Sequence, residues 1–293
     1  MSTSGPWTTL AVLDWTTRRF TEAGLDSPRL DAQLLLAHVL GCDRVQLYTG
    51  FDKPLAEAEL GRYRELIRRR LAGEPVAYLL GEQEFWGQPL WVDRHVLVPR
   101  RDTETLIEVV LAGLPARDQP LHVLDLCTGS GAIAIALARE LPAATILATD
   151  LSPEAAEVAR RNAVRAGVAD RVTVATGDLF AAAPGERQGG FELIVANPPY
   201  VATAVLAGLA PEVQHEPALA LDGGADGLVV LRRLVAEAPR WLTAGGRCVL
   251  EHGYDQGDAV AALFTAAPAG TWRDVATQAD LGGQPRVTSA RRA

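Results

Sequence analysis

The pattern of apolar and polar residues changes near residue 90. Before that point, apolar residues recur at helical spacing in three segments, 7–24, 28–40 and 55–72. Gly24, Gly41 and Gly73 stand at their ends, where a helix commonly stops in a left-handed residue. Residues 84–97 then alternate apolar and polar side chains around Gly87-Gln88-Pro89. We therefore expect a small helical bundle followed by a β-hairpin.

From residue 121 onward, short apolar runs alternate with helical segments such as 132–138 and 229–242. The runs with a strand pattern are 121–126, 145–150, 171–175, 191–196, 246–251, 272–277 and 286–289. Strand–helix alternation of this kind predicts an α/β fold, with a parallel sheet and helices on both faces. The last two runs are expected to form an antiparallel pair. A ligand would bind at the carboxyl ends of the parallel strands.

One such strand, residues 191–196, runs directly into Asn197-Pro198-Pro199-Tyr200. An asparagine offers one amide acceptor and two donors. The two prolines fix φ and lack an N–H, which leaves the carbonyls of Asn197 and Pro198 as acceptors. Tyr200 adds a flat aromatic wall. This set predicts a cradle for a planar, neutral NH2 group, and the alternative is a proline-rich turn at a strand end.

A glycine turn stands between the strand 121–126 and the alanine-rich helix 132–138. Gly129 and Gly131 allow a tight turn and a close approach of backbone to a ligand at the start of the helix. The six-residue glycine pattern of dinucleotide-binding folds does not fit, because position 134 is alanine. The turn therefore predicts a ligand site without a nicotinamide cofactor.

Acidic residues follow the next two strands. Asp150 comes roughly twenty residues after the glycines, where an acid suits a ribose diol. The alternative is a helix N-cap before Ser152. Asp178 follows the third strand and can accept from an adenine amino group, with Leu179 or Phe180 against the ring; a surface turn is the alternative there.

These motifs, in this order, resemble the class I S-adenosylmethionine-dependent methyltransferases that modify amino groups. Further stretches resemble the HemK/PrmC glutamine methyltransferases of peptide chain release factors: 27–38, 73–81, 85–87, 96–104, 216–224 and 226–228. The resemblance covers about residues 7–290. It implies a Rossmann-like sheet of seven strands with helices on both faces, joined by a β-hairpin linker to an N-terminal helical bundle. The implied domains are a substrate-recognition domain (1–83), the linker (84–98) and a methyltransferase domain (99–293).

The resemblance also implies the activity and its residues. The methyl group of S-adenosylmethionine would go to the side-chain amide nitrogen (N5) of the glutamine in the Gly-Gly-Gln loop of class-1 release factors. The implied catalytic residues are Asn197, Pro198, Pro199 and Tyr200. The implied cofactor-binding residues are Cys127, Thr128, Gly129, Ser130, Gly131, Asp150, Leu151, Asp178, Leu179 and Asn197. Cys127 departs from the glycine that many members carry, and Leu179 from the tryptophan that some members carry.

Composition agrees with this interpretation. The 293 residues include three scattered cysteines, too few for a disulfide framework or a zinc site, so we expect no metal and a reducing, cytoplasmic location. No apolar run is long enough to span a membrane. The net charge of −8 argues against a nucleic-acid substrate. Arg68-Arg69-Arg70 either compensates a helix dipole or contacts an acidic or RNA-rich partner.

Three other functions stay open at this point. The first is methylation of a glutamine in a large-subunit ribosomal protein, the activity of sister enzymes. The second is amino-group methylation of adenine or guanine, since an exocyclic amine is also a planar NH2 group. The third is cofactor binding without catalysis.

Overall fold

The computed structural model describes residues 7–293, which divide into two compact units. The helical unit comprises the chain up to Gly81 together with Ala210–His215. The sheet unit comprises Glu82–Leu209 and Glu216–Ala293. The hairpin thus belongs with the sheet. The functional division into recognition domain, linker and methyltransferase domain stays a prediction.

The helical unit confirms the three helices that periodicity predicted and adds short ones. Its helices are α1 (Thr9–Glu22), α2 (Pro28–Leu40), α3 (Arg44–Thr49), α4 (Glu57–Leu71), α5 (Val76–Leu80) and α9 (Pro211–Gln214). The helices α3, α5 and α9 are too short to show a helical repeat in the sequence, so none was predicted. Gly24, Gly41 and Gly73 have φ of 75°, 63° and 96°, as expected for residues that end helices.

The core of the helical unit is mainly apolar, and the hydroxyl of Tyr63 has a hydrogen-bond partner inside it. Phe20, Leu35 and Leu36 are fully buried between α1, α2 and α4. The hydroxyl of buried Tyr63 donates a 2.9 Å hydrogen bond to the carbonyl of Ala32 on α2. This bond satisfies the one polar atom that the Tyr63 ring brings into the core.

The arginines at the end of α4 have their partners within the helical unit. Arg70 is 6% exposed, and its guanidinium lies 2.8 Å from a carboxylate oxygen of Asp31 and 2.8 Å from one of Glu212 on α9. Arg68 and Arg69 pair with Glu65 and Glu74. Because Arg70 is buried, the three arginines do not form an exposed basic patch for an acidic partner.

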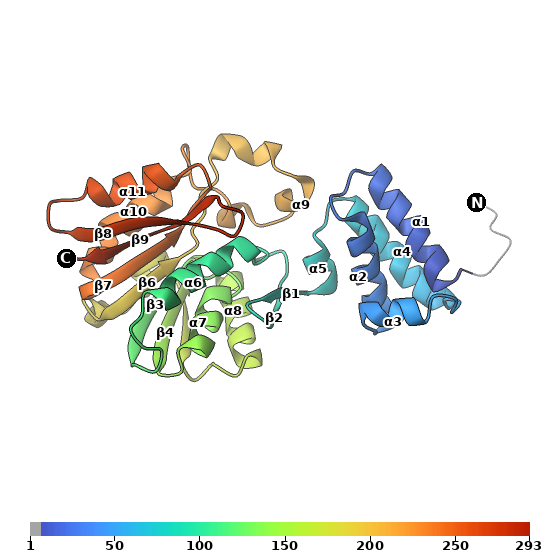
Figure 1. The fold of residues 1–293 in the computed structure, drawn as a ribbon, viewed down its shortest axis with the longest axis horizontal. Coiled ribbons are helices and arrows are strands. Elements are labelled where there is room, and N and C mark those ends of the chain that lie inside the picture. The colour runs from blue at the N-terminus through green and yellow to red at the C-terminus, as the bar shows by residue number, and fades with distance from the viewer. Residues whose placement is uncertain (1–6) are drawn as a thin grey trace. The chain divides into compact units, whose positions relative to one another are not determined.

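The sheet unit begins with the predicted hairpin, β1 (Glu82–Phe85) and β2 (Gln88–Trp91), which is shorter than the expected 84–97. The strands of its main sheet are β3 (Leu121–Leu126), β4 (Ala144–Asp150), β5 (Val172–Thr176), β6 (Phe191–Ala196), β7 (Leu242–Glu251), β8 (Trp272–Ala279) and β9 (Pro285–Arg292). They form one seven-stranded sheet in the order β5-β4-β3-β6-β7-β9-β8. The strands β5, β4, β3, β6 and β7 pair in parallel. The strand β9 is antiparallel to both of its neighbours, β7 and β8. The predicted α/β fold with a terminal antiparallel pair is confirmed (Figure 1).

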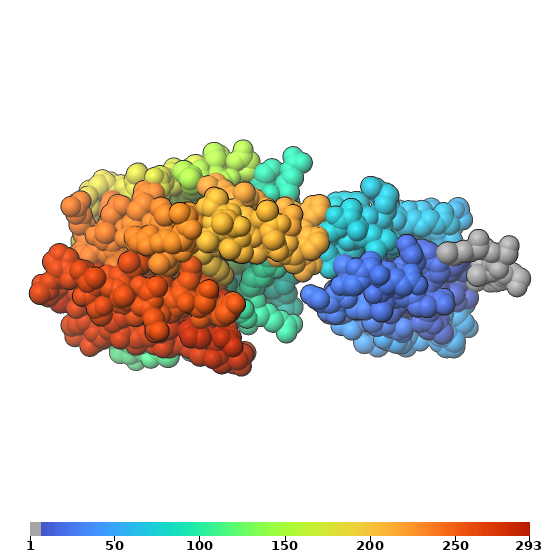
Figure 2. Space-filling model, turned by 90° about the horizontal axis from the view of Figure 1, so that it is seen from above, coloured from blue at the N-terminus to red at the C-terminus, as the bar shows by residue number. Residues whose placement is uncertain are grey.

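Helices cover both faces of this sheet. They are α6 (Glu104–Ala112), α7 (Ala132–Glu140), α8 (Pro153–Arg165), α10 (Val229–Glu237) and α11 (Gly257–Thr265). Val123 of β3 packs in the apolar cluster with α6, α7 and α8, whereas Leu124 and Leu126 pack in the cluster with α10 and α11. Alternate residues of one strand therefore point to opposite layers. The α10–α11 side gives much of the orange and red surface in Figure 2.

Short 3-10 helices join these elements: η1 (Arg101–Thr103), η2 (Leu179–Ala182), η3 (Gly185–Arg187), η4 (Thr203–Gly208), η5 (Ala218–Ala220) and η6 (Ala238–Arg240). The helix expected over 229–242 ends at Glu237 and continues as η6. Pro239 explains the early end, because its ring clashes with a carbonyl of the preceding helical turn and it lacks an N–H. The strand β7 then starts at Leu242.

Replacing Arg70 tests the buried ion cluster of the helical unit. Arg70→Ala leaves the buried Asp31 carboxylate without its partner, which should cost about 3–5 kcal/mol of unfolding free energy. Arg69→Ala is the matched control; its side chain is 38% exposed, and we expect a loss below about 1 kcal/mol. Urea unfolding measures both values. Equal losses for the two variants would contradict the assignment.

Candidate active site

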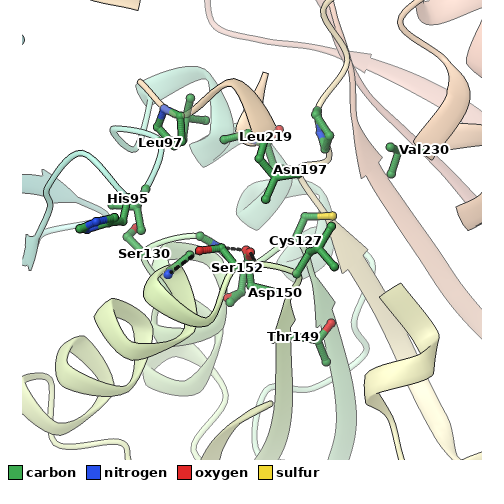
Figure 3. A pocket seen from close by; sticks show the side chains of 18 of the residues that line it. His95, Leu97, Cys127, Ser130, Thr149, Asp150, Ser152, Asn197, Leu219 and Val230 are labelled. Atoms are coloured by element: carbon green, nitrogen blue, oxygen red, sulfur yellow. Dashed lines mark hydrogen bonds between the residues drawn. The ribbon is translucent and has the colours of Figure 1, made fainter. Parts of the chain in front are cut away.

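A cavity of about 290 Å³ lies at the carboxyl ends of the parallel strands (Figure 3). The predicted site residues that line it are Cys127, Thr128, Gly129, Ser130, Asp150, Leu151, Asp178, Leu179, Asn197 and Pro199. Gly131, Pro198 and Tyr200 are not among its lining residues. The sheet thus brings the glycine turn, both acids and the asparagine to one space.

The glycine turn follows β3 and leads into α7. Gly129 has φ of 55° and open space where a side chain would begin. Gly131 has φ of 83°, and a Cβ there would lie 3.2 Å from the Cβ of Ala159 on α8. Gly131 therefore allows close helix packing rather than ligand contact. Cys127 has φ of 59°, a left-handed conformation that favours glycine, the residue common at this position in the family that the sequence resembles.

Asp150 holds this turn from the end of β4. One of its carboxylate oxygens accepts a 2.8 Å hydrogen bond from the Gly129 N–H, and the other a 2.9 Å bond from the Ser152 N–H. The cap of α8 is Ser152, whose hydroxyl accepts from the N–H of Ala155 at 3.1 Å, so the N-cap alternative for Asp150 is wrong. Burial raises the pKa of Asp150, and the backbone N–H groups oppose that rise.

Asp178 and Leu179 lie at the cavity beyond β5. Both carboxylate oxygens of Asp178 accept from the Arg233 guanidinium, at 3.0 and 2.9 Å. Leu179 lines the cavity with φ of 48°. Phe180, the other candidate for ring packing, instead stacks on Trp241 inside the core, with centroids 5.7 Å apart. Of the two, only Leu179 is at the cavity.

The amide of Asn197 is oriented by one hydrogen bond. Its Nδ2 donates to the Thr103 hydroxyl oxygen at 3.2 Å. Its Oδ1 makes no hydrogen bond to the described part of the chain, residues 7–293, and so remains an acceptor. Figure 3 shows Asn197 on the same cavity as Cys127 and Asp150.

Tyr200 has a different surrounding from the one predicted for an aromatic wall. Its ring packs against the apolar cluster under α10 and α11. Its hydroxyl donates to a carboxylate oxygen of Glu251 at 3.4 Å, and its carbonyl accepts from Gln256 Nε2 at 2.9 Å. Tyr200 thus fixes the backbone of the motif from the core side.

Sequence reasoning missed a buried asparagine that supports the glycine turn. Asn162 of α8 is fully buried; its Nδ2 donates to the carbonyls of Ser130 and Trp91, both at 2.9 Å. Its Oδ1 accepts from the Trp91 N–H at 2.8 Å. The residue joins hairpin strand β2 to the turn. Nothing in the helical pattern of residues 153–165 distinguishes Asn162 from a solvent-facing amide.

Arg100 and Glu104 both brace segments near the site. Arg100 forms an ion pair with Glu216, whose side chain is 1% exposed and also accepts from the Val98 N–H at 3.1 Å. This holds the segment before Pro217, a residue of the cavity wall. Glu104 accepts from the Trp86 N–H at 3.1 Å and so holds the hairpin turn.

The cavity has the chemistry that S-adenosylmethionine requires. A half-buried carboxylate, Asp150, faces it with acceptor lone pairs left for a ribose diol. Leu179, Val230 and Leu219 offer apolar wall, and the turn at Gly129 leaves room for close approach. The residues present fit the cofactor.

Two features are absent from residues 7–293, the part of the chain that the structure describes. No helix in that range is long and apolar enough to cross a membrane. The same residues contain no group of three His, Cys, Asp or Glu side chains placed to hold a metal ion.

Comparison with known proteins gives concordant matches. Residues 11–81 match the model of the PrmC N-terminal domain, and residues 102–216 that of the methyltransferase small domain. The release factor glutamine methyltransferase of Geobacter sulfurreducens is 44% identical over 286 residues, covering 97% of both chains. That of Rhodopirellula baltica is 39% identical over 296 residues, covering 100% of this chain and 99% of its own.

Among solved structures, the release factor-specific protein-(glutamine-N5) methyltransferase of Alicyclobacillus acidocaldarius is 30% identical. The match covers 67% of this chain and 94% of that one, with a TM-score of 0.42. The full-length relatives confirm the family that the motifs indicated. The chain belongs to the PrmC/HemK family of release factor glutamine methyltransferases, enzymes that use S-adenosylmethionine.

Proposed function

We propose that this protein methylates the side-chain amide nitrogen (N5) of the glutamine in the Gly-Gly-Gln loop of class-1 peptide chain release factors. The observation that carries the proposal is the Asn197 amide, whose Oδ1 is an acceptor without a partner among residues 7–293 and lies on the cavity of Gly129 and Asp150. The relatives with full-length matches are release factor glutamine methyltransferases, which supports this substrate.

Within this proposal, the residues at the carboxyl edge of β3, β4 and β5 would hold the cofactor. Asp150 would bind the ribose, and Asp178 and Leu179, which line the same cavity, would hold the adenine. The remaining contacts come from Cys127, Thr128, Ser130 and Leu151, together with the backbone at Gly129 and the amide of Asn197. Gly131 contributes by letting α7 pack against α8.

The protein's chemical task is to orient a weak nucleophile. When bound, S-adenosylmethionine supplies a methyl group that is already activated on a sulfonium. An amide nitrogen has its lone pair delocalised into the carbonyl. The Asn197 Oδ1 and the Pro198 carbonyl accept its two hydrogens, so the nitrogen can become more tetrahedral and direct its lone pair into the cavity. Fixed acceptors also stabilise the positive charge that grows on nitrogen, and one of its two hydrogens then leaves as a proton to water.

Pro199, Tyr200 and the helical domain have supporting roles. Pro199 lines the cavity and Tyr200 anchors the motif in the core, which keeps the two carbonyl acceptors in place. We assign substrate recognition to the helical domain of residues 1–83 and place the protein in the cytoplasm, where release factors act. Its cysteines Cys42, Cys127 and Cys248 are free thiols, in agreement with a reducing compartment.

Asn197→Ala tests the cradle. Removing one preorganised acceptor should lower kcat by about 10²-fold or more. Binding of S-adenosylhomocysteine, measured by calorimetry, should change much less, because Asp150 and the glycine turn remain. Gln188→Ala, which removes an exposed amide, is the control and should keep wild-type kcat. Wild-type turnover by a folded Asn197→Ala protein would rule out the role given to Asn197.

The substrate is identified by mass spectrometry of a co-expressed release factor. The proposal predicts one added methyl group on the loop glutamine, absent with Asn197→Ala. Parallel incubations with labelled cofactor and either ribosomal protein or DNA test the two other acceptors. If the labelled methyl group appears in DNA or ribosomal protein and not in the release factor, the proposed substrate is wrong.

A further inference from the structure

We infer that Arg233 is a positioning residue that fixes the Asp178 carboxylate as the acceptor for the amino group of adenine, and so makes the site prefer adenine to a 6-oxo purine. The inference rests on the adenine contact that the proposed function gives to Asp178. In this scheme Arg233 acts through Asp178, which receives the hydrogen bond from the base.

The turn after β5 brings Asp178 to the cavity on a fixed backbone. Thr176, the last residue of β5, lies opposite Asp150 in the parallel pairing of β4 with β5. The N–H of Gly177 donates a 2.8 Å hydrogen bond to the Asp150 carbonyl. The side chain of Asp178 is 51% exposed, so the backbone alone does not determine its rotamer. A partner is needed to orient the carboxylate.

Arg233 supplies that partner from α10. Its two terminal guanidinium nitrogens donate to the two carboxylate oxygens of Asp178, at 3.0 and 2.9 Å. Val230, three residues earlier, lies on the same face of α10 and, like Arg233, lines the cavity (Figure 3). The nearest carboxylate oxygen of Glu237 is 4.0 Å from Arg233 Nε, beyond hydrogen-bond distance. Asp178 is therefore the closer of the two acidic partners.

The two parallel hydrogen bonds fix a plane as well as a distance. A carboxylate has about four lone-pair positions, and a bidentate guanidinium takes one on each oxygen. The positions that remain lie in the same plane, on either side of the ion pair. The amino group of adenine can donate to one of them, whereas a 6-oxo purine presents an acceptor at the same place.

The neighbouring arginine shows what an ordinary surface ion pair on this helix is like. Arg232 pairs with Asp226, six residues away, and their side chains are 45% and 50% exposed. Arg233 and Asp178 are almost equally exposed, but they are 55 residues apart in sequence and both line the cavity, which Arg232 and Asp226 do not. Exposed pairs contribute little to stability. The position of the Arg233 pair at the cavity therefore distinguishes it.

The apolar residues of this part of the cavity do not select an amino group. Leu179 and Val230 offer aliphatic contact to any purine ring. Leu179 also lacks the aromatic face that could stack on the base. A choice between an amino and an oxo group therefore needs a polar side chain of fixed orientation, which the ion pair provides.

Calorimetry with two ligands tests the inference: S-adenosylhomocysteine, and S-inosylhomocysteine, in which an oxygen replaces the amino group of the base. We expect the wild type to bind the adenine ligand about 10- to 100-fold more tightly, because the oxo group sets an acceptor against the carboxylate. Arg233→Ala should weaken the adenine ligand about 10-fold, the lower end of the effect of removing a partner that orients a binding residue. The inosine ligand should change much less, so the preference for adenine falls.

Arg232→Ala is the matched control. It removes the adjacent exposed arginine and its ion pair, and it should leave both affinities unchanged. Arg233→Lys keeps the charge but cannot form two parallel hydrogen bonds, so it should recover little of the preference. Because exposed ion pairs contribute little to stability, all three variants should fold with thermal midpoints near that of the wild type.

Three results would overturn the positioning role. They are an Arg233→Ala protein that keeps the wild-type preference, one that loses affinity for both ligands equally, and an Arg233→Lys protein with the full preference. Equal losses would indicate a general packing role of Arg233. A full preference in the lysine variant would show that the fixed plane is not needed.

Asp178→Ala separates this failure from that of the adenine contact. It should remove the preference, and adding Arg233→Ala should then have little further effect, because both changes interrupt one interaction. If Asp178→Ala loses the preference and Arg233→Ala keeps it, only the role of Arg233 is wrong. If the wild type has no preference, or Asp178→Ala keeps it, the adenine contact and the inference both fail. The role of Asn197 in methyl transfer is tested separately, by Asn197→Ala.

Discussion

The parallel pairing of β3 with β4 and β6 is the constraint on which the site depends. Leu126 at the end of β3 lies opposite Thr149 of β4 and Ala196 of β6. The next residue of each strand, Cys127, Asp150 or Asn197, therefore emerges at the same edge. Because register in a parallel sheet is fixed by buried apolar residues, a shift of one residue would turn each of these side chains to the wrong face.

The same edge carries two buried carboxyl groups near the carboxyl ends of β3 and β7. Asp125 and Glu251 are fully or almost fully buried, and burial raises the pKa of each to about 7. Asp125 keeps one hydrogen bond, from the Thr128 hydroxyl at 2.6 Å, and each carboxyl has one oxygen without a partner among residues 7–293. Such groups lower stability near neutral pH, and they are concentrated where the backbone turns toward the ligand.

Most of the fold and much of the site could be predicted from the sequence, because both rest on local patterns. Strands 121–126 and 191–196 have the predicted bounds, and Gly129, Asp150, Asp178 and Asn197, which follow the strands, share one cavity. What the sequence left open or predicted wrongly involves choices that local pattern does not contain. The N-cap of α8, left open between Asp150 and Ser152, and the side of the sheet that the Tyr200 ring faces, predicted wrongly, both depend on contacts that the sequence pattern does not show.

The path of the chain just after the Asn-Pro-Pro-Tyr motif has a consequence for how the protein can be divided. Residues Ala210–His215 cluster with the helical unit, although they are encoded between two parts of the sheet unit. A fragment ending at Gly81 would keep Arg70 but lack Glu212, one of the two carboxylates that compensate it. The two units are thus interlaced in sequence, so neither can be exchanged for that of another enzyme by a single crossover. Recombination between relatives would have to carry the segment around α9 together with the N-terminal helices.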